Sequence, residues 1–282
     1  MNYPKQICVS DLDGTLLPHH GTISRENLDC LHKLRERGII NVLATGRSLY
    51  SLKRHLSEDA PFDYVIFSTG AGIMDWKSGE LIYSKDLQNS DIRKICEILE
   101  GGDIDYMLHE RIPDSHILRY REKAGLKDFW SRIEHYRDFA SVLEDEDISN
   151  AGAATQFLAV VAHGREDLYL ELCRRLHPIN PIRTTSPMDL KSLWIEVFAP
   201  GVNKGTSLNY LLKLLGIPAE HCMVVGNDYN DLDMLKLTAA AYVTANAPED
   251  LKAEYHTVAA CEEDGFAEAV RHWLHDKDLR RS

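Results

Sequence analysis

The stretch Ile7-Cys8-Val9-Ser10-Asp11-Leu12-Asp13-Gly14-Thr15-Leu16-Leu17 lies near the start of a chain of 282 residues. Its short apolar run is typical of a buried strand, and the run leads directly into two carboxylates followed by a glycine. Because Gly14 indicates a turn, we expect Asp11 and Asp13 at the carboxyl edge of that strand. Two anions held together require a cation, and oxygen ligands on a loop suit Mg²⁺, which binds one or two carboxylates together with water and phosphate.

The next segments predict further α/β units whose strands end in polar turns. Ser24 can cap a helix with apolar residues at helical spacing that ends near Gly38. A second strand, 41–44, is followed by Thr45-Gly46, and a third, 64–68, by Thr69-Gly70-Ala71 and a hairpin over 73–84. The ends of parallel strands meet at one edge of a sheet, where a hydroxyl and exposed N–H groups suit phosphate oxygens.

The C-terminal third of the sequence returns to this α/β pattern. Lys204 begins an apolar helix that ends at Gly216, although a cation at a helix start opposes the helix dipole. The strand 222–226 is followed by Asn227-Asp228-Tyr229-Asn230-Asp231. Segments 240–243 and 257–260 are expected to be edge strands, and 266–274 a closing helix.

In this order the motifs resemble those of the haloacid dehalogenase superfamily of phosphohydrolases. Asp11 to Thr15 match D-x-D-x-T, Thr45 matches the phosphate-binding Thr or Ser, Lys204 matches the lysine of the third motif, and Gly226, Asn230 and Asp231 fit G-D-x-x-N-D. The resemblance implies that Asp11 is the nucleophile, Asp13 the general acid/base, and Lys204 the cation that neutralises Asp11 and the phosphoryl group. It also implies phosphate binding by Leu12, Thr45, Gly46, Lys204 and Asn230.

The sequence departs from the family pattern where Asn227 stands in place of the first Asp of the fourth motif, normally a ligand of Mg²⁺. An Asn carbonyl oxygen can still bind the metal, or a small backbone shift could bring Asp228 inward. We favour Asp228 as the source of the negative charge, with Asn227 binding the metal directly or through a neighbour. Asp231 would orient the ligands or brace Lys204. The metal candidates are therefore Asp11, Asp13, Asn227, Asp228 and Asp231.

Residues 85–198 mix helical segments with alternating strands and predict an inserted α+β domain. Its position resembles the type IIB cap of Cof-like and sucrose-phosphatase-like members. The predicted fold is thus α/β, with a Rossmann-like parallel-sheet core formed by 1–84 and 199–282. We expect the cap to determine specificity, with Arg119, Arg121 and Glu196 as substrate-binding candidates.

Composition limits the partners. The formal net charge of −12 opposes a phosphate-rich polymer, so we expect no nucleic acid partner. The six cysteines form no close pair and indicate free thiols in a reducing compartment. Without a signal-like or membrane-spanning stretch, a cytoplasmic protein is expected, with no membrane partner. The sequence indicates no protein partner.

These features predict a Mg²⁺-dependent phosphatase that hydrolyses a small phosphate monoester, such as a sugar or other metabolite phosphate, through an aspartyl-phosphate. Two alternatives remain open. Phosphomutases or phosphotransferases of the same superfamily use the same carboxylates with a related cap. A non-enzymatic sugar-phosphate sensor would be consistent with Asn227.

Overall fold

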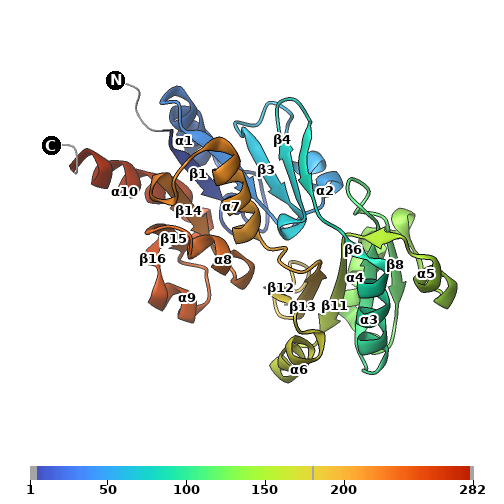
Figure 1. Cartoon of the computed structure of the whole chain (residues 1–282). Helices are drawn as coiled ribbons and strands as arrows, with labels where there is room; N and C mark the ends of the chain where they lie inside the picture. The colour runs from blue at the N-terminus through green and yellow to red at the C-terminus, as the bar shows by residue number, and fades with distance from the viewer. Residues whose placement is uncertain (1–4, 180, 280–282) are drawn as a thin grey trace. The chain divides into compact units, whose positions relative to one another are not determined.

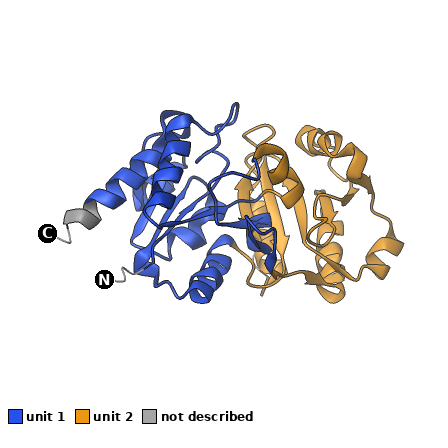
Figure 2. Cartoon of the chain, turned by 90° about the horizontal axis from the view of Figure 1, so that it is seen from above, with its two compact units in different colours: residues 1–46, 57–82, 204–282 blue, residues 47–56, 83–203 orange. Residues whose placement is uncertain are grey.

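The computed structural model describes residues 5–179 and 181–279. The chain divides into two compact units (Figure 2), unit 1 with residues 1–46, 57–82 and 204–282, and unit 2 with residues 47–56 and 83–203. The division expected from the sequence differs from this one, because the short segment 47–56 belongs with the insert and the last boundary falls at 203/204. The roles of the units as catalytic core and cap stay predictions.

Unit 1 is organised around an eight-stranded sheet with the order β16-β15-β14-β1-β2-β3-β4-β5 (Figure 1). Strands β16 to β3 run parallel, and β4 returns antiparallel to β3. The bounds are β1 (Ile7–Ser10), β2 (Ile40–Ala44), β3 (Tyr64–Phe67), β4 (Gly72–Asp75), β5 (Leu81–Ser84), β14 (Cys222–Gly226), β15 (Ala240–Thr244) and β16 (His256–Val258). The predicted α/β fold with a parallel-sheet core is confirmed. The expectation that β15 is an edge strand is wrong, because β16 pairs with its outer side.

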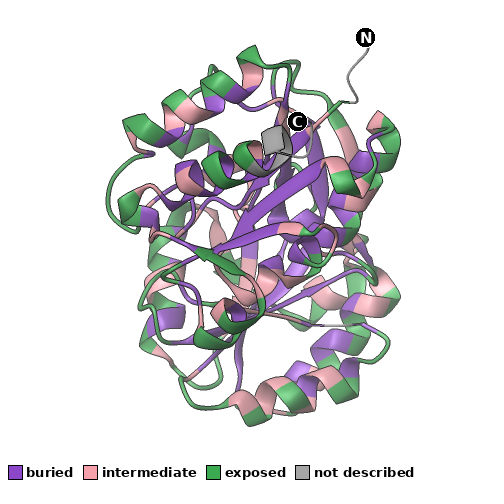
Figure 3. Cartoon of the chain, turned by 90° about the vertical axis from the view of Figure 1, so that its left-hand side faces the viewer, coloured by how far each residue is buried: buried purple, intermediate pink, exposed green. Residues whose placement is uncertain are grey.

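Strand β1 is apolar along its length because it lies inside this sheet. All its residues are buried between β14 and β2, as is usual where helices cover both faces of a parallel sheet. Figure 3 shows buried strands and helices with exposed sides. The helices of unit 1 are α1 (Arg25–Glu36), α7 (Lys204–Leu215), α8 (Leu232–Leu235), α9 (Glu249–Glu254) and α10 (Gly265–Leu279), with short helices η1 (Ser68–Gly70), η3 (Ala219–His221), η4 (Tyr229–Asp231) and η5 (Cys261–Glu263).

Unit 2 has a six-stranded sheet with the order β12-β13-β11-β7-β8-β9 and a two-stranded sheet of β10 and β6. All its strand pairs are antiparallel except β8 with β9. The strands are β6 (Leu87–Gln88), β7 (Asp105–His109), β8 (Leu118–Arg121), β9 (Ala140–Val142), β10 (Ala153–Ala154), β11 (Gln156–Val161), β12 (Ile182–Thr185) and β13 (Leu193–Phe198). The helices are α2 (Leu49–His55), α3 (Asn89–Glu100), α4 (Lys127–His135), α5 (Asp145–Asn150) and α6 (Glu166–Leu176), with the short helix η2 (Arg137–Phe139).

Helices cover both faces of the larger sheet in unit 2. Phe129 and Ile133 of α4 share a buried cluster with Met107 of β7. Tyr106 points to the opposite face, because neighbouring strand residues alternate, and its hydroxyl lies 3.2 Å from the sulfur of Cys96 on α3. This sandwich explains the alternating pattern of the insert.

Helix α2 joins unit 2 through an aromatic stack. The ring of Tyr50 lies parallel to that of His116, with centroids 4.3 Å apart, and edge-on to Phe139 at 5.0 Å.

Two expectations about the chain as a whole can be compared with the described residues. All six cysteines are free, as predicted. In the described part of the chain, no helix has both the length and the apolar character needed to cross a membrane.

Candidate active site

Asp11 lies immediately after β1, at the carboxyl edge of the parallel sheet. Its N–H donates to the carbonyl of Val225 on β14 at 2.9 Å, and its side chain is buried. The next residues form a tight turn in which the Leu12 carbonyl accepts from the N–H groups of Leu16, at 3.0 Å, and Leu17, at 2.7 Å. No described residue accepts a hydrogen bond from the Leu12 N–H. That donor is therefore available at the strand end.

The turn brings the first and fourth motifs together. Thr15 donates a hydrogen bond to Asn227 Oδ1 at 3.2 Å. Gly14 has a φ of +78°, which glycine adopts without strain, and a Cβ added there would lie 2.4 Å from Asn227 Nδ2. The Asn227 side chain therefore lies against residues 14 and 15. The role of Thr15 was missed from the sequence, although its place in D-x-D-x-T was the available signal.

Lys204, the first residue of α7, joins two carboxylates. Its Nζ lies 2.6 Å from Asp11 Oδ1 and 2.7 Å from Asp231 Oδ1, and all three side chains are buried. Asn230 Oδ1 lies 3.4 Å from the same Nζ. The structure thus brings together four residues that were predicted from three separate motifs.

The electrostatics of this cluster follow from its burial. Burial raises the pKa of Asp11, Lys204 opposes the shift, and the carboxylates of Asp231 and Asp13 add to it. Burial also acts to lower the pKa of Lys204, but Asp11 and Asp231 more than offset this and raise it above the usual lysine value. Lys204 is therefore protonated at neutral pH, and its positive charge limits the rise in the pKa of Asp11 without cancelling it.

Asp231 and Asp228 are both engaged in local hydrogen bonds. Asp231 Oδ2 accepts from the N–H groups of Asn227, at 2.8 Å, and Asp228, at 3.1 Å, so both of its oxygens have partners. Asp228 Oδ1 accepts from the Tyr229 N–H at 2.8 Å and caps η4. Gly226 leaves room for this arrangement, since a Cβ there would lie 2.6 Å from Asp231 Oδ2. Asp231 therefore contacts Lys204 through one oxygen and the turn at residues 227 and 228 through the other.

Thr45 follows β2 at the same edge of the sheet and is fully buried. Its N–H donates to the Ile66 carbonyl at 2.8 Å, and its carbonyl accepts from the Thr69 N–H at 3.0 Å. Thr69 has a φ of +52°, which is strained for a β-branched residue. Gly46 is the last residue of unit 1 before the segment 47–56.

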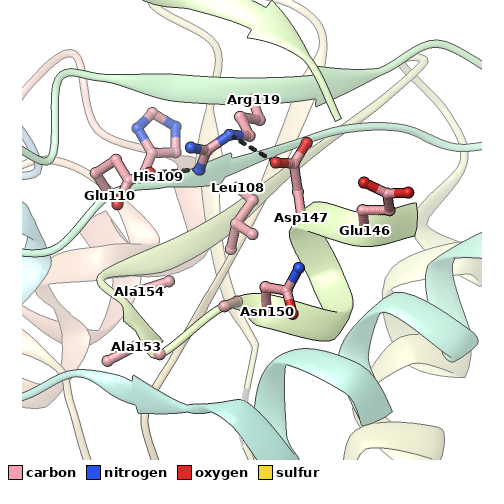
Figure 4. A pocket seen from close by; sticks show the side chains of 11 residues that line it. Leu108, His109, Glu110, Arg119, Glu146, Asp147, Asn150, Ala153 and Ala154 are labelled. Atoms are coloured by element: carbon pink, nitrogen blue, oxygen red, sulfur yellow. Dashed lines mark hydrogen bonds and ion pairs between the residues drawn. The ribbon is translucent and has the colours of Figure 1, made fainter. Parts of the chain in front are cut away.

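The two arginines predicted to bind substrate have carboxylate partners within unit 2. Arg119 pairs with Glu110, and its Nε lies 3.5 Å from Asp147 Oδ1, beside a cavity of about 320 Å³ (Figure 4). Arg121 donates to Glu100 at 2.9 Å and to Asp145 at 3.1 Å. Substrate binding by Arg119 and Arg121 stays a prediction, and it would require these ion pairs to open.

Glu196 is buried on β13. Its role in specificity also stays a prediction. Sequence reasoning overlooked Arg132 on α4, which has no carboxylate partner among the described residues.

The oxygen atoms of the carboxylates and of the Asn227 amide at the sheet edge are suitable ligands for a hard cation. Among the described residues, no group of three or more His, Cys, Asp or Glu side chains is arranged to hold a metal. A site here therefore needs an amide or backbone oxygen beside the carboxylates, and Asn227 places an amide next to the turn that carries Asp13. A set of one or two carboxylates with further neutral oxygens is typical of Mg²⁺.

The family model for haloacid dehalogenase-like hydrolases matches residues 8–270. The chain belongs to this family and is an enzyme of its phosphatase class.

Three relatives illustrate the likeness. The chain is 30% identical over 270 residues to the HMP-PP phosphatase of Cronobacter sakazakii, with 94% of each chain covered. It is 27% identical over 267 residues to the 5-amino-6-(5-phospho-D-ribitylamino)uracil phosphatase YcsE of Bacillus subtilis, again with 94% of each covered. The solved structure of BT4131, a HAD subclass IIB sugar phosphatase, shares the fold with a TM-score of 0.77 at 21% identity, over 95% of this chain and 99% of that one.

Proposed function

We propose that this enzyme hydrolyses the phosphate monoester of a small metabolite with Asp11 as nucleophile. The observation that carries the proposal is the buried Asp11–Lys204–Asp231 cluster at the carboxyl edge of the parallel sheet, the edge at which open α/β sheets bind ligands. A buried lysine held by two carboxylates can neutralise an attacking carboxylate and a phosphoryl group without reorganisation.

The chemistry would proceed in two displacements. An Asp11 oxygen attacks phosphorus, the bond from phosphorus to the ester oxygen breaks, and Asp13 gives its proton to the leaving alkoxide. Asp13 then removes a proton from water, which attacks the aspartyl-phosphate and releases inorganic phosphate and the Asp11 carboxylate. The Leu12 N–H, Thr45, Gly46 and Asn230 would bind the phosphoryl oxygens.

Mg²⁺ held by Asp11, Asp13 and Asn227 would supply charge neutralisation to the phosphoryl oxygens. Two contacts favour Asn227 over the initially preferred Asp228, since Asn227 lies against the turn at residues 14 and 15 whereas the Asp228 carboxylate caps η4. Asp231, with both oxygens engaged, would hold Lys204 in place.

The names of the relatives support a small phosphorylated metabolite as substrate. One relative is named for HMP-PP and another for a phosphoribitylamino-uracil. Because both match this chain over nearly its whole length at similar identity, neither name selects a substrate, and a sugar phosphate remains an equal proposal.

The test is phosphate release from a panel of sugar, polyol, nucleotide and pyridoxal phosphates in the presence of Mg²⁺. Asp11→Asn should lower turnover at least about a thousandfold and should prevent mass-spectrometric trapping of a phosphorylated Asp11. Asp59→Asn, an exposed aspartate in unit 1, is the matched control and should behave like the parent. Turnover retained by Asp11→Asn would exclude the mechanism, and transfer to a second sugar without phosphate release would indicate a mutase.

A further inference from the structure

Arg132 of α4 has aromatic neighbours but no hydrogen-bond acceptor in the part of the chain that the structure describes. The guanidinium carbon lies 4.6 Å from the ring centre of Trp194 on β13 and 5.1 Å from that of Tyr136. Its Nε is buried without a partner, and no described residue forms a hydrogen bond or an ion pair with the group. Two carboxylates, those of Glu196 and Asp128, act electrostatically on Arg132 without forming an ion pair with it. The Asp128 carboxylate accepts from Ser186 Oγ and from Trp194 Nε1, both at 2.7 Å. The two rings thus hold a guanidinium group that forms no ion pair with any described residue.

This arrangement is costly for the folded protein. Burial lowers the pKa of Arg132, and the opposing influence of Tyr136, Glu196 and Asp128 does not offset it. Arg119 and Arg121 in the same unit each form ion pairs with two carboxylates. Arg132 differs from them in forming none with a described residue. A half-buried cation without a partner is typical of a site whose partner is a ligand.

Two further unpaired polar groups lie on the same face of the sheet. His109 and Gln156 are directly paired residues of β7 and β11, and both are more than nine-tenths buried. Directly paired residues point to one side, and His109 shares its side with Met107, which packs against α4 in one buried cluster. Within residues 5–179 and 181–279, no group forms a hydrogen bond with His109 Nε2 or Gln156 Oε1.

The state of His109 decides what it can bind. Burial, followed by the charge of Arg132, lowers the pKa of His109 to about 3, so the ring is neutral at physiological pH. His109 Nδ1 lies 2.8 Å from the Ser115 carbonyl and must donate to it, because a carbonyl oxygen only accepts. His109 Nε2 is therefore an acceptor, suited to a ligand hydroxyl.

We propose that the Arg132 cluster is a binding site in unit 2 for a carboxylate group of a hydroxylated small molecule. The cluster consists of Arg132, Tyr136, Trp194, His109 and Gln156. The planar guanidinium group can donate parallel hydrogen bonds to two anion oxygens, and the flanking rings hold its plane. The free acceptors of His109 and Gln156 suit hydroxyl groups of the same ligand. The anion has two possible sources, a second acidic group of the substrate, which rests on the proposed function, or a separate metabolite acting as an effector.

The test is isothermal titration calorimetry with the full chain carrying Asp11→Asn, which blocks the proposed turnover. The probes are two matched pairs, 6-phosphogluconate with glucose 6-phosphate, and 3-phosphoglycerate with glycerol 3-phosphate, and in addition gluconate alone. Arg132→Gln removes the guanidinium group, and Arg132→Lys keeps the charge but loses the planar fork. Arg174→Gln, an exposed arginine of α6 in the same unit, is the matched control.

In at least one pair, the member that carries a carboxylate (6-phosphogluconate or 3-phosphoglycerate) should bind about tenfold more tightly than its partner. Arg132→Gln should abolish this preference. Arg132→Lys should weaken it, and Arg174→Gln should leave it unchanged. The melting temperature of Arg132→Gln should equal or exceed that of the parent, whereas loss of a structural arginine would lower it. If gluconate binds and its binding depends on Arg132, the anion belongs to a separate metabolite. If the carboxylate-bearing member of a pair binds more tightly but gluconate does not bind, the anion belongs to the substrate.

Equal binding within both pairs, or a preference that persists in Arg132→Gln, would overturn the proposal. Calorimetry does not require turnover, so the two proposals can fail separately. If the parent chain hydrolyses no ester, the proposed function is refuted while the anion site is still tested.

Discussion

Replacing Lys204 by methionine would test whether its ammonium group holds the candidate site together. Methionine nearly retains the length of the side chain but removes the charge. The carboxylates of Asp11 and Asp231, with side chains 6% and 0% exposed, would then face each other without a cation. Because water cannot replace the lost charge at this depth, the variant should be strongly destabilised.

The magnitude follows from the burial of the partners. Removing one partner of a buried ion pair costs about 3–5 kcal/mol, most of it from the charge left unpaired. Lys77 is the matched control, because its Nζ lies 2.8 Å from Asp63 Oδ1 with side chains 55% and 19% exposed. Loss of such an exposed pair costs about 1 kcal/mol or less. The two lysines form ion pairs of similar length but differ in burial, so comparing the two substitutions isolates the effect of burial on stability.

The assay is urea-induced unfolding at pH 7 of the parent, Lys204→Met and Lys77→Met, followed by circular dichroism. The free energy of unfolding should fall by about 2–4 kcal/mol more in Lys204→Met than in the control. An equal fall in the free energy of unfolding in the two variants would refute the inference that the Lys204 ammonium group stabilises the buried carboxylates of Asp11 and Asp231. Loss of phosphatase activity without any loss of stability would assign Lys204 a catalytic role alone.

Further predictions concern the metal, the strained turn and unit 2. Asn227→Ala should weaken Mg²⁺ binding in calorimetry about tenfold, whereas Asp228→Ala should mainly cost about 1 kcal/mol of stability through loss of the η4 cap, and the opposite result would return Asp228 to the ligand set. Thr69→Gly should raise the free energy of unfolding by about 1 kcal/mol, since it relieves the φ of +52°, and lower stability would show that the Thr69 side chain makes stronger contacts than the strain costs. Asp105→Ala should cost about 3 kcal/mol or more in urea unfolding, because the buried carboxylate accepts from the N–H groups of residues 123–126, and an unchanged midpoint would contradict this role.

The catalytic candidates of the first motif were predictable because local order determines them. An apolar run that ends in Asp11-Leu12-Asp13-Gly14 places carboxylates at a strand end in any parallel sheet, and the structure has β1 inside such a sheet. Lys204 and Asp231 lie far from Asp11 in the sequence, so only the order of motifs shared with the family linked them. Their contact depends on β14 pairing with β1, which no local pattern encodes.

The partners of polar side chains were not predictable. Arg119 and Arg121 looked like cations available to a substrate, but each has carboxylate partners within unit 2. The sequence does not single out Arg132, because an arginine on a helix is usually solvated. Its position between two rings arises only when α4 packs against β13.

By itself, the sequence determined the class of fold, the ends of β1, β2 and β14 and the residue types that follow them, because hydrophobic periodicity and turn residues act over a few neighbouring positions. Only the tertiary structure decided that the Asn227 side chain meets the first motif while Asp228 caps its own turn, and that the segment 47–56 belongs to unit 2. Hydrogen bonds and charge pairs depend on distances of a few ångströms between residues remote in the chain, and packing alone sets those distances.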